Sequence, residues 1–120
     1  MPVEQPSDAY RSGQLYAALE ALQKLGDVGF RALGRPESRA RAAAKPLTHL
    51  RDPLWMVGRS YDAARRRGRA AAAGSVFRSI PDLMPSGKEL PGSLGPEEQK
   101  EFLLGRQAQE DAIAEETGFR

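Results

Sequence analysis

Leucines in the segment "QLYAALEALQKL" recur every three or four residues, and this periodicity constrains the fold more than any other feature of the chain. Such spacing places apolar side chains along one face of an α-helix. Ser7 or Asp8 is suited to cap the start of this helix, and Gly26 to end it in a left-handed conformation. The sequence nowhere alternates apolar and polar residues as a half-buried strand does. It therefore predicts a helix that continues to Leu25, and no sheet.

Prolines and glycines mark where the other helices are expected to begin and end. Proline is favoured at the first helical position and interrupts a helix interior, whereas glycine is common just after the last residue. Asp52 followed by Pro53 resembles a capped helix start. The expected helices run from near Pro36 to an interruption at Pro46, from Pro53 to about Arg67 before Gly68, from there to a stop at Pro81, and from Pro96 to about Ala114. Residues 85–96 are predicted to be a loop.

The composition indicates a core of leucine and alanine. Apolar residues make up 40% of the 120 residues and aromatic residues 7%, so helix formers must supply most of the buried surface. Trp55, Tyr61 and Phe77 could stack on bases, as aromatic side chains do in single-strand binders. Because they lie at helical spacing among apolar residues, they are expected to join this core instead. We predict an all-α fold, a compact bundle of about five helices. The expected parts are an extended N-terminal lead (1–6), a single helical-bundle domain (7–116) and a C-terminal tail (117–120).

Residue counts disfavour several classes of protein and of site. The chain has no cysteine, which excludes disulfides, a thiol nucleophile and a cysteine zinc site. His49 is the single histidine, and we expect it to be a polar residue at a helix surface or interface. There is no Gly-rich phosphate loop, so neither a cofactor nor a metal is expected and an enzyme is the least expected class. Because no apolar run reaches membrane length and no secretory signal precedes the first helix, we expect a cytoplasmic protein with no membrane partner.

The charge is distributed unevenly along the chain. Residues 1–30 have a formal charge of −2, residues 31–78 have twelve basic and three acidic residues and a charge of +9, and residues 79–120 have a charge of −5. A strongly basic segment of this kind favours binding to a polyanion.

The candidate DNA-binding residues all lie in the basic middle segment. They are Arg59, Arg65, Arg66, Arg67 and Arg69, with Arg39, Arg41 and Lys45 as a second basic group. Each phosphate that such a cation neutralises releases counterions, which adds salt-dependent affinity without reading the base sequence. Gly68 leaves two arrangements open: one continuous helical strip of arginines, or a helix end joined to a basic loop.

Three stretches match short motifs in a fixed order: "YRSGQLYAALEALQ" (10–23), "PLTHL" (46–50) and "LGPEEQKEFLLGRQAQ" (94–109). They resemble the opening Tyr-x-x-Gly-x-Leu helix, a proline and leucine segment, and the closing motif of the C-terminal helical domain of the type I-C CRISPR large subunit. The residues that match the closing motif are Leu94, Glu97 or Glu98, Gln99, Phe102, Leu104, Gly105 and Gln107 or Gln109. Family members usually carry an aromatic and histidine-containing stretch where this chain has Arg106, Gln107 and Ala108.

This resemblance implies a specific role. In type I-C systems the domain is also translated from an internal start as a separate small protein, and a chain that begins at Met1 just ahead of the domain fits that product. Copies of it are the small subunits of the Cascade complex, and they are non-catalytic helical bundles. The resemblance therefore implies contacts with the backbone and large subunits, with other copies of itself, indirectly with the guide RNA, and with target DNA, above all the displaced non-target strand of the R-loop.

Two other functions remain open from the residues alone. A free-standing helical DNA-binding regulator would use a recognition helix and prefer one duplex sequence. A structural adaptor would use the same arginines to bind acidic protein surfaces.

Overall fold

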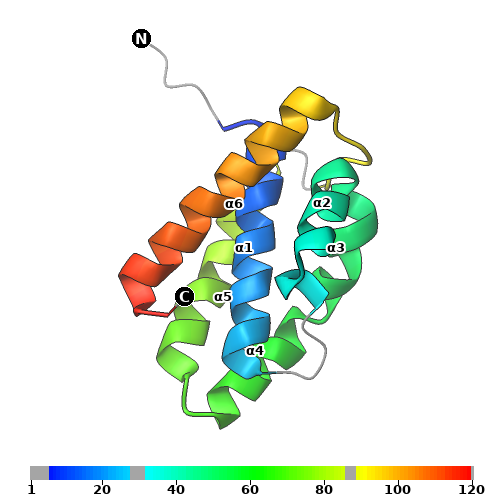
Figure 1. Ribbon diagram of the computed structural model, residues 1–120. Coiled ribbons are helices and arrows are strands. Elements are labelled where there is room, and N and C mark those ends of the chain that lie inside the picture. Colours follow the sequence, from blue (N-terminus) through cyan, green and yellow to red (C-terminus); the bar gives the residue numbers. More distant parts are fainter. Residues whose placement is uncertain (1–5, 28–31, 86–88, 120) are drawn as a thin grey trace.

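The computed structural model describes residues 6–27, 32–85 and 89–119, and over these ranges the chain is all-helical, as the sequence predicts (Figure 1). The described residues form six α-helices and one short 3-10 helix, and contain no strand. One helix more than the expected five or so is present because the "PLTHL" segment is itself helical. The elements are α1 (Asp8–Gly26), η1 (Ala32–Gly34), α2 (Pro36–Ala44), α3 (Pro46–Trp55), α4 (Val57–Arg66), α5 (Ala70–Leu83) and α6 (Pro96–Thr117).

Helix α1 runs through the middle of the bundle and contacts every other helix (Figure 1). Its leucines are the predicted apolar face, and Leu15 and Leu22 are fully buried. Tyr16 is fully buried as well, and its ring meets that of Phe102 on α6 edge to face, with the ring centres 5.8 Å apart. The core is therefore arranged around a single central helix.

Two glycines allow α1 and α6 to cross with their backbones in contact. A Cβ added to Gly13 of α1 would overlap the carbonyl oxygen of Phe102, and one added to Gly105 of α6 would overlap the carbonyl oxygen of Tyr10. Any larger residue at either position would push the two helices apart. The helices that begin and end the described fold are thus held at their closest possible distance.

The start of α1 follows the sequence prediction, and its end does not. The backbone N–H of Tyr10 donates to Ser7 Oγ at 3.1 Å, so Ser7 caps the helix. At the other end, the left-handed residue is Asp27, with φ 45°, and not the predicted Gly26. Gly26 stays helical because α4 packs against it: a Cβ there would lie 2.7 Å from the carbonyl oxygen of Ser60.

No helix begins at Pro53, so that prediction was wrong: residues 46–55 form α3, and the rest of the predicted helix is α4, which begins at Val57. Lys45 has φ −139° and ψ 76°, outside the helical region, because a residue that precedes proline is pushed out of it. Helix α2 therefore ends there and α3 starts at once. Asp52 does not cap a helix, since it lies inside α3. Pro53 lies near the end of α3, where its missing N–H removes a single helical hydrogen bond.

The predicted loop 85–96 passes over the junction between α2 and α3. In its described part, the N–H of Leu94 donates to the carbonyl of Ala44 at 2.8 Å. The carbonyl of Pro91 accepts a hydrogen bond from the N–H of Leu47 at 2.9 Å. Leu90 and Leu94 are both buried. These contacts hold the short helices α2 and α3 against the rest of the bundle.

The last two helices run longer than predicted. Pro81 does not stop α5, which continues to Leu83, because proline near a helix end costs only one hydrogen bond. Helix α6 begins at Pro96 as predicted but extends past Ala114 to Thr117, where Gly118 ends it. Within the described ranges, no helix combines the length and apolar composition that crossing a membrane requires.

Candidate nucleic-acid interface

The turn between α4 and α5 divides the cluster of four arginines. Helix α4 ends at Arg66, and Gly68 follows in the left-handed region with φ 78°. The N–H of Gly68 donates to the carbonyl of Arg65 at 3.0 Å, and the N–H of Arg69 donates to the carbonyl of Ala64 at 2.9 Å. This pair of bonds is the Schellman arrangement, which glycine favours. Of the two arrangements that the sequence left open, the arginines form a helix end joined to a tight turn.

Arg69 and the half-exposed Arg67 both contact the end of α1. Arg67 donates Nε–H to the carbonyl of Gly26 at 3.0 Å and pairs with the Asp27 carboxylate at 3.5 Å. Arg69 donates from Nη1 to the carbonyl of Leu25 at 2.8 Å, and its guanidinium lies over the ring of Phe119 at 5.6 Å. Cations at a helix C-terminus satisfy its unpaired carbonyls and complement the helix dipole. These two candidates therefore hold the α4–α5 turn onto α1.

The other three candidates on α4 face water. Arg66 is 80% exposed and pairs with Asp62, one helical turn earlier, at 2.9 Å. Arg65 is exposed and lies 6.0 Å from the centre of the Tyr61 ring. Arg59 is exposed, and no ion pair to it is found among the described residues. Because exposed pairs and ring contacts of this kind are weak, all three remain able to contact a phosphate.

The second basic group is divided in the same way. Arg41 and Lys45 are exposed at the end of α2 and just after it. Arg39 is two-thirds buried and its Nη2 lies 3.4 Å from the carboxylate of Glu20 on α1. We define the exposed basic set as the five exposed candidates that make no contact with the end of α1: Arg41, Lys45, Arg59, Arg65 and Arg66.

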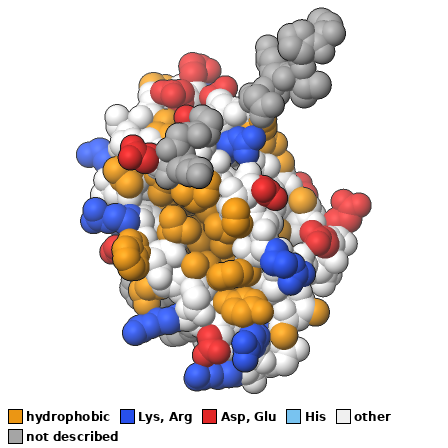
Figure 2. All heavy atoms as spheres, turned by 180° about the vertical axis from the view of Figure 1, so that it is seen from behind, with side chains coloured by type: hydrophobic (Ala, Val, Ile, Leu, Met, Phe, Trp, Pro, Cys, Tyr) orange, Lys and Arg blue, Asp and Glu red, His pale blue; other side chains and the backbone are white. Residues whose placement is uncertain are grey.

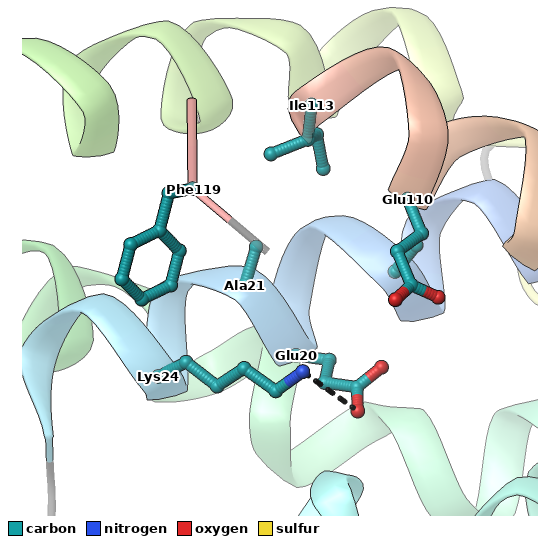
Figure 3. A pocket seen from close by; sticks show the side chains of 7 residues that line it. Glu20, Ala21, Lys24, Glu110, Ile113 and Phe119 are labelled. Carbon is teal, nitrogen blue, oxygen red and sulfur yellow. Dashed lines mark ion pairs between the residues drawn. The ribbon is translucent and has the colours of Figure 1, made fainter. Parts of the chain in front are cut away.

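Arg39 belongs to a buried ion cluster that joins α1, α2 and α6. Glu20 is 4% exposed and accepts a hydrogen bond from Arg106, which is 7% exposed, at 3.2 Å. Arg106 also pairs with Glu110 at 3.0 Å, and Lys24 lies 3.7 Å from Glu20, as Figure 3 shows. The sequence did not predict that Glu20 and Arg106 would form a buried ion pair. Glu20 lies among the leucines of the first helix, and this position was the signal that it is buried.

The same region contains a small cavity, and its size limits what it can hold. The cavity lies beside the ion cluster between α1, α6 and the Phe119 ring, and its volume is about 20 Å³ (Figure 3). That is space for about one water molecule. Tyr16 is also buried in this region and donates its hydroxyl hydrogen to the carbonyl of Leu33. Burial, followed by the nearby negative charge of Glu20, raises the pKa of Tyr16 above its usual range, so its hydroxyl stays protonated.

Among the described residues, no three His, Asp or Glu side chains are placed to hold a metal ion. His49 is half-buried and lies with Arg41 in a concavity between α2 and α3, at a helix interface as predicted. The buried acidic groups are engaged with arginines. The arrangement is suited to binding through exposed cations.

Among the aromatic residues that were expected in the core, Trp55 departs most from the prediction. Its side chain is 83% exposed, so the expectation that it belongs to the core was wrong. Leu54 and Val57 on either side of it pack against the core, and α3 ends between them, which leaves Trp55 facing outward. Tyr61 does pack against the core, as predicted. Phe77, whose ring lies 4.9 Å from that of Tyr61, is 38% exposed and outside the core, so its expected burial was wrong as well.

Beside Trp55, the surface has a groove of about 350 Å³. It is lined by Leu47, Arg51, Leu54, Trp55, Met84, Glu89 and Leu90. Figure 2 shows hydrophobic side chains gathered at the centre of the face opposite that of Figure 1, with basic and acidic side chains distributed around them. The basic residues therefore surround an apolar surface and do not form a single patch.

Comparison with known proteins places the chain in no established group. No model of a known protein family matches the sequence. No curated protein matches it significantly either. The class that the fold and the interface define is a helical bundle built on one central helix, with exposed cations around an apolar groove.

Proposed function

We propose that the chain is a non-catalytic small subunit of a type I-C CRISPR surveillance complex, Cascade. In this role it contacts the backbone and large subunits and other copies of itself, meets the guide RNA indirectly, and binds the displaced strand of target DNA. The exposed basic set supplies the contacts to DNA phosphates.

The observation that carries the proposal is where the first and last motifs lie in the fold. Gly13 belongs to the opening motif and Gly105 to the closing motif, and these two glycines form the crossing of α1 and α6. Phe102, another residue of the closing motif, packs against Tyr16 in the same contact. Residues that carry the resemblance therefore build one structural unit, which supports a common fold rather than a chance similarity of short motifs.

The exposed cations support a contact with DNA that does not read sequence. R-loop formation is nearly balanced in base-pairing energy, so protein contacts to the separated strands can favour it. Contacts to phosphates position a strand and carry no sequence information directly. Cations spread around one side of a small bundle, as in Figure 2, are suited to such a contact.

The test is the salt dependence of DNA binding. We expect the triple variant R41Q/R59Q/R65Q to bind single-stranded DNA more weakly than wild type. The slope of log K against log salt should fall by about 2, since each lost phosphate contact contributes about 0.7 on single strands.

The matched control is R35Q/R78Q/K100Q, which removes the same charge from exposed positions outside the exposed basic set. It should keep the wild-type slope. Equal slopes for wild type and R41Q/R59Q/R65Q would contradict the assigned contacts. Binding of one duplex sequence far above others would favour a regulator, and failure of the chain to join a complex that lacks its small subunit would contradict the proposed assembly.

A further inference from the structure

Trp55 is the most exposed large hydrophobic residue in the described part of the chain. The others range from Phe77 at 38% to Leu104 at 64% exposed. An indole left in water loses the stabilisation that burial would provide, and exposed apolar surface of this kind commonly marks a binding site. Trp55 is therefore a candidate for contact with a ligand.

The position of Trp55 follows from the way α3 and α4 meet. The side chains of Leu50 and Leu54 on α3 pack in the core or against it, and Trp55 is the last residue of that helix. Met56 ends α3, with φ −93° and ψ 7°, and α4 restarts at Val57, which again packs against the core. The bundle thus determines which neighbours of Trp55 are buried, and leaves the indole at the edge of the groove.

Cations lie on both sides of Trp55 along the chain. Arg51 is four residues earlier, which places it on the same helix face, and it lines the same groove. Arg59, four residues later, is exposed. The contact of Arg51 with Asp52 is weak, because the two atoms are 4.0 Å apart and the side chains are 66% and 87% exposed.

One acidic side chain, Glu89, lines the groove as well. It would repel a phosphate there, so a strand that crosses Trp55 would place its phosphates near Arg51 and Arg59. An aromatic face between cations is the combination that single-strand binders use, with bases on the ring and phosphates on the cations.

We propose that Trp55 stacks on an unpaired base of single-stranded DNA, while Arg51 and Arg59 bind the neighbouring phosphates. The inference rests on the proposed function and adds to its phosphate contacts a side chain that contacts the unpaired bases of the displaced strand. In a duplex each base face is covered by the next base pair, so only a separated strand can offer a face to the indole. Stacking tolerates any base, which suits a displaced strand of arbitrary sequence.

The experiment uses the fluorescence of Trp55, which is the only tryptophan in the chain. Oligothymidylate is the single-strand probe, and a duplex of equal length is the comparison. We expect oligothymidylate to quench the emission and the duplex to bind without quenching it.

Substitution adds a second measurement. W55A should weaken oligothymidylate binding by roughly 5- to 100-fold and leave duplex binding unchanged, since base stacking is worth about 1–3 kcal/mol. W55F keeps an aromatic ring and should recover part of the loss. L104A removes a comparably exposed apolar side chain from α6 and should bind both probes as wild type does.

The contrary outcomes separate the inference from the proposed function. If oligothymidylate binds with no change of emission and W55A binds it as tightly as wild type, the stacking inference is wrong and the proposed DNA contact stands. If neither probe binds, both are wrong. If W55A keeps its DNA affinity but no longer joins the Cascade subunits, the groove is a protein-docking surface and the stacking inference is overturned.

Discussion

At the scale of single residues, the arginines of one basic segment have three different roles. Arg69 closes the end of α1, Arg39 pairs with a buried carboxylate, and Arg65 lies in water. The side chains are chemically identical, and their surroundings alone distinguish the roles. A charge count over 31–78 therefore overstates the number of cations that DNA can reach.

This division predicts different effects on stability. R69Q should lower the free energy of unfolding by about 1–3 kcal/mol, because two carbonyls at the end of α1 lose a charged donor. R65Q makes the same chemical change at an exposed position and should alter stability by less than about 0.5 kcal/mol. Urea denaturation followed by circular dichroism compares them. If R65Q were as destabilising as R69Q, the capping role would be wrong.

At the scale of helices, the contact between α1 and α6 is the tightest in the fold. It has no room for a methyl group at either of its two glycines, so the helices approach to backbone contact. The buried pair of Glu20 and Arg106 lies along the same contact. Breaking a buried pair by removing one partner is costly, so this pair also resists separation of the two helices.

Glycine substitutions test the crossing directly. G13A and G105A should each destabilise the protein by about 1–3 kcal/mol or more, because the added methyl group overlaps a carbonyl of the facing helix. The control is G58A, which lies in α4 with no atom near an added Cβ and should stabilise slightly through its higher helix propensity. Thermal unfolding gives the melting temperature of each variant, and those of G13A and G105A should lie below that of G58A. Equal values would be inconsistent with backbone contact at the crossing.

At the scale of the whole molecule, the buried polar groups connect elements that are distant in sequence. Tyr16 joins α1 to η1 through the carbonyl of Leu33, and the cluster of Glu20 and Arg106 joins α1 to α2 and α6. Because each of these groups contacts its partners only when several helices are in place, the bundle is expected to unfold as one unit.

Tyr16 makes this cooperative unit sensitive to alkaline pH. Its pKa is raised in the folded state, mainly by burial, so the unfolded chain loses the hydroxyl proton first, at about pH 10. Stability that is fully present below pH 10 should therefore decline as pH rises further. Urea midpoints between pH 8 and 11 should fall more steeply for wild type than for Y16F, which cannot ionise there. Parallel curves would show that another group controls alkaline unfolding.

Local chemistry explains which parts of the fold the sequence could predict. The leucine period, the Ser7 cap and the proline at Pro96 each act within one or two turns, so they marked helices correctly. The errors at Gly26, Pro53 and Pro81 share a cause, because each residue can end or begin a helix but need not do so. Gly26 stays helical because α4 packs against it. Pro53 and Pro81 stay within helices because each lies near a helix end.

The sequence by itself determined the helical class, the main helices and the concentration of positive charge in the middle of the chain. Only the tertiary structure decided which arginines cap or pair inside the bundle, and that Trp55 lies in water beside a groove. The physical reason is distance. Propensity and charge are properties of a residue and its neighbours in sequence, whereas a capping contact such as that of Arg69 with Leu25 spans 44 residues and exists only once the helices have packed.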